Sequence, residues 1–156
     1  MNDTFALDLG RSGDKDKDMP VYPVAPGEIV ENDNTMGFIL IKHEVPLVLD
    51  NGEVLAQWYS GYMHMRSKTS ATFVDKDTSI GRISNTGLGA NGDNHLHFAL
   101  YSGDHTSLNQ MVSLDLPNKL TKFNDYIAGW YKLCPGSTNE GYQARHWWSV
   151  GQTPCP

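Results

Sequence analysis

The 156-residue chain has the composition of a globular domain and a charge that excludes two classes of partner. Hydrophobic residues make up 39% and charged residues 19%, which is enough apolar surface for a core and too little charge for a disordered chain. The formal net charge of −6 disfavours nucleic acids, which need a basic face, and electrostatic attachment to anionic lipids. No segment has the length and apolar content of a membrane span.

The first half of the chain is expected to form short strands. Phe5 to Leu9 reads as a first strand. Val21 to Val30 reads as two extended pieces broken at Pro26-Gly27, which is a typical turn pair. Gly37 to His43 is rich in β-branched residues and predicts a further strand.

A hairpin and two more strands are predicted next. Asp50-Asn51-Gly52 separates the apolar segments Leu47 to Leu49 and Glu53 to Leu55, and Asn-Gly between apolar runs is a strong hairpin signal. Gln57 to Met65 and Ser79 to Ser84 are expected to be strands as well. Many short strands with turns between them favour an antiparallel sheet or sandwich.

The segment Asn94 to Leu100 holds the most informative pattern in the chain. On a strand, residues two apart share a face. His95 and His97 therefore point to one side, while Leu96 and Phe98 point to the core. Such an arrangement fixes two imidazoles on a rigid backbone, as a metal ligand beside a general acid or base requires.

Two further positions have the right chemistry to join these histidines. His64 follows Tyr62 in an aromatic segment, and Asp8 lies between two leucines. Taken alone, His64 fits a hydrogen-bonded core residue as well as a catalyst. The Asp8 carboxylate is expected either to face water or to serve a site. Carboxylate and imidazole are both ligands that zinc accepts.

The order of these motifs resembles the lysostaphin/LytM-type zinc metallopeptidases. The resemblance covers about residues 4 to 101, within an expected core of residues 1–104. Its segments, in chain order, are an early Asp in an apolar strand, Pro20 to Val30, Gly37 to His43, Tyr62 to Met65, Ile80 to Gly87 and His95 to Phe98. The resemblance implies a mainly β, antiparallel fold of the LytM type.

The resemblance also implies a role for each matching residue. Asp8 and His97 match two zinc ligands, for a single zinc ion, and His64 and His95 match the two catalytic histidines. The family's first zinc ligand, a histidine four residues before the aspartate, is replaced here by Thr4. A hydroxyl is a much poorer zinc ligand than an imidazole, and catalytic zinc sites use three protein ligands plus water.

Several residues remain open as a third ligand. Asp3 is adjacent to Thr4, and the histidines elsewhere in the chain, His43, His105 and His146, are weaker candidates. His43 has a plausible structural role at a strand end. Without a third ligand the chain would be an inactive domain, either degenerate or engineered, that binds cell wall or regulates another hydrolase.

Residues 105–156 lie outside the resemblance and are expected to form a C-terminal extension. Only Leu120 to Leu133 has helical spacing, with Phe123 and Ile127 one turn apart. Cys134 and Cys155, both flanked by proline, predict one disulfide, which fits an oxidising compartment. Two unrelated thiols remain the alternative.

The function that the resemblance implies is zinc-dependent hydrolysis of peptide cross-links in bacterial peptidoglycan. Such a substrate places the protein in the periplasm or outside the cell. The first residues lack the basic stretch and apolar run of a secretory signal. We therefore expect that a signal has been removed, that the chain is one domain of a longer polypeptide, or that another route exports it. The aromatic side chains near these motifs fit either a substrate groove or the core: Tyr59, Tyr62, Trp147 and Trp148.

Overall fold

The computed structural model describes residues 3–10, 14–49, 51–106 and 110–114, and the backbone of two short strands, Lys132–Leu133 and Trp147–Trp148. All pairings between strands in this part of the chain are antiparallel. The expected mainly β, antiparallel class is therefore confirmed. Within these residues, no helix is long and apolar enough to cross a membrane.

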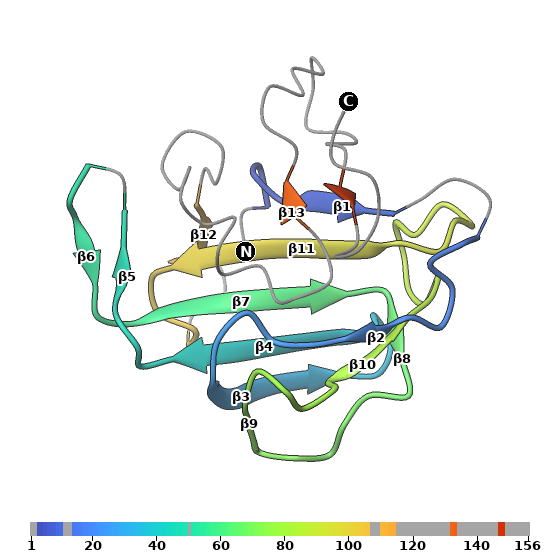
Figure 1. Ribbon diagram of the computed structural model, residues 1–156, viewed down its shortest axis with the longest axis horizontal. Helices are drawn as coiled ribbons and strands as arrows, with labels where there is room; N and C mark the ends of the chain where they lie inside the picture. Colours follow the sequence, from blue (N-terminus) through green and yellow to red (C-terminus); the bar gives the residue numbers. More distant parts are fainter. Residues whose placement is uncertain are drawn as a thin grey trace.

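A seven-stranded sheet forms the centre of the molecule (Figure 1). Its strands follow the order β1-β11-β7-β4-β3-β9, and β12 pairs with β11. Three of the central strands are buried along most of their length, as expected for strands that are covered on both faces. The strands are β1 (Leu7–Leu9), β3 (Gly27–Asp33), β4 (Phe38–His43), β7 (Trp58–Met63), β9 (Phe73–Val74), β11 (Leu96–Ser102) and β12 (Val112–Ser113).

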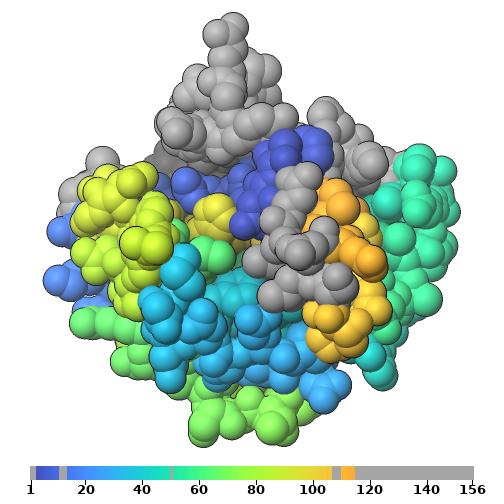
Figure 2. Space-filling view, turned by 180° about the vertical axis from the view of Figure 1, so that it is seen from behind, coloured from blue at the N-terminus to red at the C-terminus, as the bar shows by residue number. Residues whose placement is uncertain are grey.

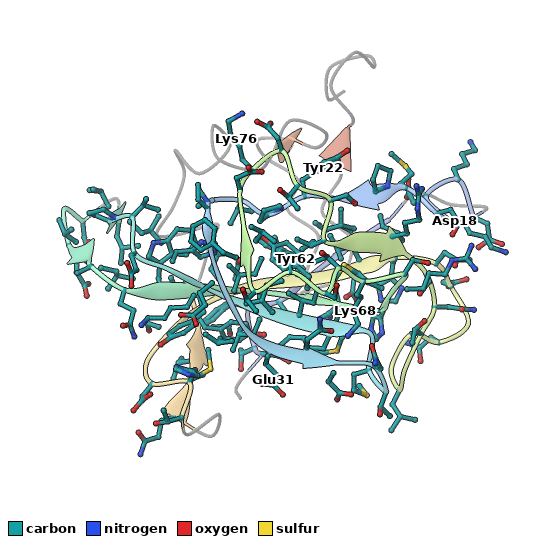
Figure 3. All side chains as sticks on the ribbon, turned by 90° about the horizontal axis from the view of Figure 1, so that it is seen from below. Asp18, Tyr22, Glu31, Tyr62, Lys68 and Lys76 are labelled. Carbon is teal, nitrogen blue, oxygen red and sulfur yellow. The ribbon has the colours of Figure 1, made fainter. Side chains whose placement is uncertain are left out.

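A small sheet of order β2-β10-β8 covers one face of the central sheet. It consists of β2 (Pro20–Val21), β8 (Met65–Arg66) and β10 (Gly81–Ile83). Figures 1 and 3 show it as a second layer, with Tyr62 in the interior between the layers. The Tyr62 hydroxyl accepts a hydrogen bond of 2.9 Å from the Val24 amide, which ties the central sheet to the segment after β2.

The opposite face of the central sheet has a smaller core of its own. Alternation along β11 separates the two cores, since Phe98 and Leu100 face the small sheet while Ala99 and Tyr101 face the other way. The Tyr101 ring packs in this core only because Gly61 on β7 has no side chain. A Cβ atom added there would lie 2.8 Å from Cε2 of Tyr101.

Two two-stranded ribbons complete the described elements. The Asn-Gly hairpin is confirmed as β5 (Leu47–Val48) and β6 (Val54–Leu55). β13 (Lys132–Leu133) pairs with β14 (Trp147–Trp148). The last two residues of the helix expected over Leu120 to Leu133 thus lie in a strand. The rest of that segment, and the cysteine pair Cys134 and Cys155, lie outside the described residues.

The strand expected over Gln57 to Met65 is interrupted. It divides at His64, where the backbone has a φ of +66°. Non-glycine residues adopt such a φ only rarely. The chain leaves β7 of the central sheet at this residue and enters β8 of the small sheet. The expectation of one continuous strand was therefore wrong at the position that matters most for the site.

Candidate functional site

Asp8 and His97 meet on the face of the central sheet that lies away from the small sheet. They are directly opposite each other in the pairing of β1 with β11, so their side chains leave the sheet on the same side. Nδ1 of His97 lies 2.8 Å from Oδ1 of Asp8. The structure thus brings together the two residues expected to hold a metal.

His95 lies beside this pair, just before β11. Its Nδ1 is 3.1 Å from the Asp93 carbonyl oxygen, and because a carbonyl can only accept, Nδ1 carries the proton. In the neutral tautomer that this bond selects, Nε2 has no hydrogen. This atom is buried without a hydrogen-bond partner among the described residues, 3.6 Å from Oδ1 of Asp8. A buried nitrogen with no partner costs stability, so it indicates a position kept for another group.

His64 completes the group of residues expected from the sequence. Its ring centre lies 4.7 Å from that of His95 and 5.9 Å from that of His97. Nδ1 is 2.8 Å from the Thr86 carbonyl oxygen, so this nitrogen is the donor and Nε2 is the free base. All four expected site residues, from three separate parts of the chain, are therefore within one small region.

The loop between β10 and β11 holds both catalytic candidates in place. Thr86 binds the ring of His64, while Ser84 pairs through its backbone with His95. The Ser84 hydroxyl also donates to the His64 carbonyl oxygen at 2.6 Å. Figure 2 shows this loop in yellow-green on the same side of the molecule as the blue N-terminal segment. One loop thus fixes the separation of the two imidazoles.

Burial and nearby charge shift the pKa values of the group in different directions. Burial lowers the pKa of His64, which favours its neutral form. For His97, burial alone would lower the pKa, but the carboxylates of Asp3 and Asp8 outweigh it and raise the pKa to about 9. The hydrogen bond from His97 lowers the pKa of Asp8. The metal-free pair is therefore an ionised carboxylate and an imidazolium at neutral pH.

Asp3 is a member of this region on the other side of the His97 ring. Its Oδ2 lies 3.8 Å from Nε2 of His97, an ion-pair distance. Its Oδ1 accepts a short hydrogen bond from the Tyr101 hydroxyl. Sequence reasoning considered Asp3 as a ligand but gave Tyr101 no role at the site. Its position four residues after His97, on the same face of β11, is the signal that would have found it.

The donor chemistry of the region fits zinc, although the number of grouped ligands is low. Imidazole and carboxylate oxygen are the ligands that zinc takes. Asp8 supplies a carboxylate and His97 an imidazole, with Oδ1 of Asp8 2.8 Å from Nδ1 of His97. Nε2 of His95, which has no hydrogen-bond partner among the described residues, faces the same carboxylate. Among the described residues, no three histidine, cysteine or acidic side chains are grouped as a bound metal would require. Thr4 is exposed.

The other histidines considered as ligands lie elsewhere. His43 is fully buried between the sheets, with Nε2 2.7 Å from the Ser60 hydroxyl. His105 contacts the Tyr59 hydroxyl at 3.2 Å, and His146 lies outside the described residues.

The aromatic residues divide in the same way. Tyr59 and Tyr62 are buried and belong to the two cores, so they do not line a groove. For Trp147 and Trp148 the structure describes only the backbone of β14.

Comparisons with known proteins give a partial likeness to solved structures. No protein-family model matches the chain, and no curated protein matches it. Among solved structures, it is similar to a point mutant of the catalytic domain of the prophage-encoded M23 protein EnpA from Enterococcus faecalis. The identity is 17% and the TM-score 0.42, over 69% of this chain and 87% of that one. A likeness this weak establishes no activity. Any inference about function must therefore come from the grouped residues themselves.

Proposed function

We propose that this chain is a zinc-dependent endopeptidase that hydrolyses peptide cross-links of bacterial peptidoglycan, outside the cytoplasmic membrane. The observation that carries the proposal is the convergence of Asp8, His64, His95 and His97 in one region. The substrate class comes from the resemblance of the ordered motifs to lysostaphin/LytM-type peptidases. Zinc and the substrate are parts of the proposal.

Asp8 and His97 are the residues that would hold the metal. A bound zinc ion polarises a scissile carbonyl and lowers the pKa of a bound water. Zinc competes with the proton on His97, because only the neutral imidazole binds metal. With two grouped protein ligands in place of three, we expect the affinity to be lower than that of a typical catalytic site.

His64 and His95 supply the proton transfers. In each ring, Nδ1 donates a hydrogen bond to a backbone carbonyl oxygen, so the neutral ring presents Nε2 as an acceptor. The lowered pKa of His64 suits it to take a proton from water at neutral pH. The imidazole that takes the proton from water can return it to the leaving amine. The other can stabilise the developing oxyanion in its protonated form, in which Nε2 is a donor.

The competing proposal is an inactive domain of the same fold that binds cell wall. Two observations favour it: an exposed threonine at the first ligand position, and the absence of a third grouped ligand among the described residues. The two proposals differ in two measurable properties, because only the peptidase must both bind zinc and cleave peptidoglycan.

The deciding experiment measures zinc binding and digestion of purified peptidoglycan together. The unchanged chain is compared with Thr4→His, which restores the missing imidazole, and with His97→Ala, which removes a proposed ligand. His105→Gln is the matched control, since it replaces a histidine outside the site. New amino groups released from peptidoglycan report cleavage.

Each outcome separates the two proposals. Zinc binding and cleavage by the unchanged chain, lost in His97→Ala and kept in His105→Gln, would support the peptidase. Zinc and cleavage only after Thr4→His would establish an inactive domain with an otherwise intact site. If neither the chain nor Thr4→His bound zinc, the metallopeptidase proposal would be wrong.

A further inference from the structure

We propose that Asp3 and Tyr101 are a positioning pair that holds the His97 ring from the side opposite to Asp8. The proposal deepens the function given above and rests on it, because it concerns the ring that would bind the metal. It assigns Asp3 a role distinct from that of a third ligand, and it makes Tyr101 part of the site.

The contacts form a continuous series across the ring. The Tyr101 hydroxyl donates to Oδ1 of Asp3. Oδ2 of the same carboxylate faces Nε2 of His97 at 3.8 Å, and Nδ1 of His97 faces Asp8 at 2.8 Å. The two carboxylates therefore occupy different nitrogens of one imidazole.

Because the two carboxylates face different nitrogens, Asp3 fits a positioning partner of His97 better than a third metal ligand. The nitrogens of an imidazole point in divergent directions, so a metal on Nδ1 with Asp8 lies on the far side of the ring from Asp3. A carboxylate on the second nitrogen is a recurrent partner of metal-binding histidines, because it fixes the ring orientation and tautomer. The position of Asp3 fits this partner and does not fit a shared ligand.

The rest of the fold keeps Asp3 and Tyr101 in place. Tyr101 is 1% exposed, and its ring lies over Gly61, where any Cβ atom would approach within 2.8 Å. The Asp3 carbonyl oxygen accepts a hydrogen bond of 2.9 Å from the Ala6 amide, which turns the chain just before β1. Ala99, between His97 and Tyr101 on this face, has only a methyl group. Space for the carboxylate is thus provided by β7, β11 and the turn before β1.

The test uses Asp3→Asn and Tyr101→Phe in the full chain. Tyr59→Phe is the matched control, because Tyr59 is a buried tyrosine directly opposite Tyr101 in the sheet and makes its hydroxyl contacts away from the site. The first readout is the ring nitrogen and N–H resonances of the histidines in metal-free protein. The second is zinc affinity, measured in the Thr4→His background if the unchanged chain does not bind.

We expect Asp3→Asn to shift the Nε2 resonance of His97 and to weaken zinc binding about 10- to 100-fold, as loss of such partners does. Tyr101→Phe should change both in the same direction by less, and Tyr59→Phe should change neither. Normal His97 resonances in Asp3→Asn would overturn the positioning pair, whatever the metal result. If zinc never binds, the function fails, and the resonances alone still decide the pair.

Discussion

Acid should destabilise this protein in part through His43, one of two buried histidines in the described part of the chain. Its side chain is fully buried, stacked on Trp58 with ring centres 4.1 Å apart. Nδ1 donates to the Pro26 carbonyl oxygen at 2.9 Å, and Nε2 accepts from the Ser60 hydroxyl at 2.7 Å. Both nitrogens are therefore satisfied in the neutral form. Burial lowers the pKa to about 4, although the Pro26 hydrogen bond acts to raise it.

The sign and size of the effect follow from linkage. The unfolded chain, with a histidine pKa near 6.5, binds this proton more readily than the folded chain. The contribution of His43 to stability is therefore fully present above pH 6.5, is lost as the pH drops toward 4, and changes no further below that value. A shift of this size corresponds to about 3 kcal/mol at full effect and about 2 kcal/mol between pH 7 and pH 5.

The assay is urea unfolding at pH 7 and pH 5 for the unchanged chain and for His43→Gln. The glutamine variant loses some stability at both pH values, but it has no proton to gain. Its drop in unfolding free energy between the two pH values should be smaller by about 2 kcal/mol. His105→Gln, at a less buried histidine, should keep the full drop. Equal drops in the unchanged chain and His43→Gln would refute the reasoning.

Three further predictions concern sites where packing or hydrogen bonding leaves little freedom. Gly61→Ala places a Cβ atom 2.8 Å from the Tyr101 ring and should cost about 1–3 kcal/mol in urea unfolding; an unchanged midpoint would contradict the packing. Lys68→Met removes an ammonium with three oxygen acceptors at 2.5, 2.6 and 3.0 Å and should cost about 1–3 kcal/mol, whereas Lys76→Met, at an exposed lysine, should cost nothing measurable. Gly87→Ala, at φ +90° and with its Cβ atom 2.8 Å from Cα of Met36, should shift the loop beside His64 and His95, so any loss of cleavage should exceed what the change in melting temperature explains.

The sequence predicted those parts of the fold where local signals and burial agree. The alternation from His95 to Tyr101 gave both the strand and its two faces, since Phe98 is 1% exposed while His97 remains partly exposed. The Asn51-Gly52 pair predicted its hairpin because the turn demands a positive φ, which Gly52 has at +85°. The strands Phe73–Val74 and Val112–Ser113 were missed, because two residues are too few for any periodicity to be visible.

The candidate site was predictable as a set of residues that lie together, and not as an arrangement. Spacing on a strand placed His95 and His97 together. Nothing in the local sequence indicated that the chain would turn at His64, because the positive φ there is imposed by contacts with distant segments. The role of Asp3 depends on which nitrogen of His97 it faces, and this is decided by three strands packing together. Sequence patterns report faces and periods; they carry no information about such distances.

The place of His64 between two sheets has a consequence for protein engineering. Its amide donates to the Met36 carbonyl, its carbonyl accepts from the Ser84 amide at 3.0 Å, and its ring is held by the loop after β10. The position of the imidazole therefore depends on both layers and on the loop, and neither sheet alone would fix it. A design that grafted only β1, β7 and β11 onto another scaffold would carry over Asp8 and His97 but leave His64 without its support. The smallest transplantable unit is the pair of layers with the loop that joins β10 to β11.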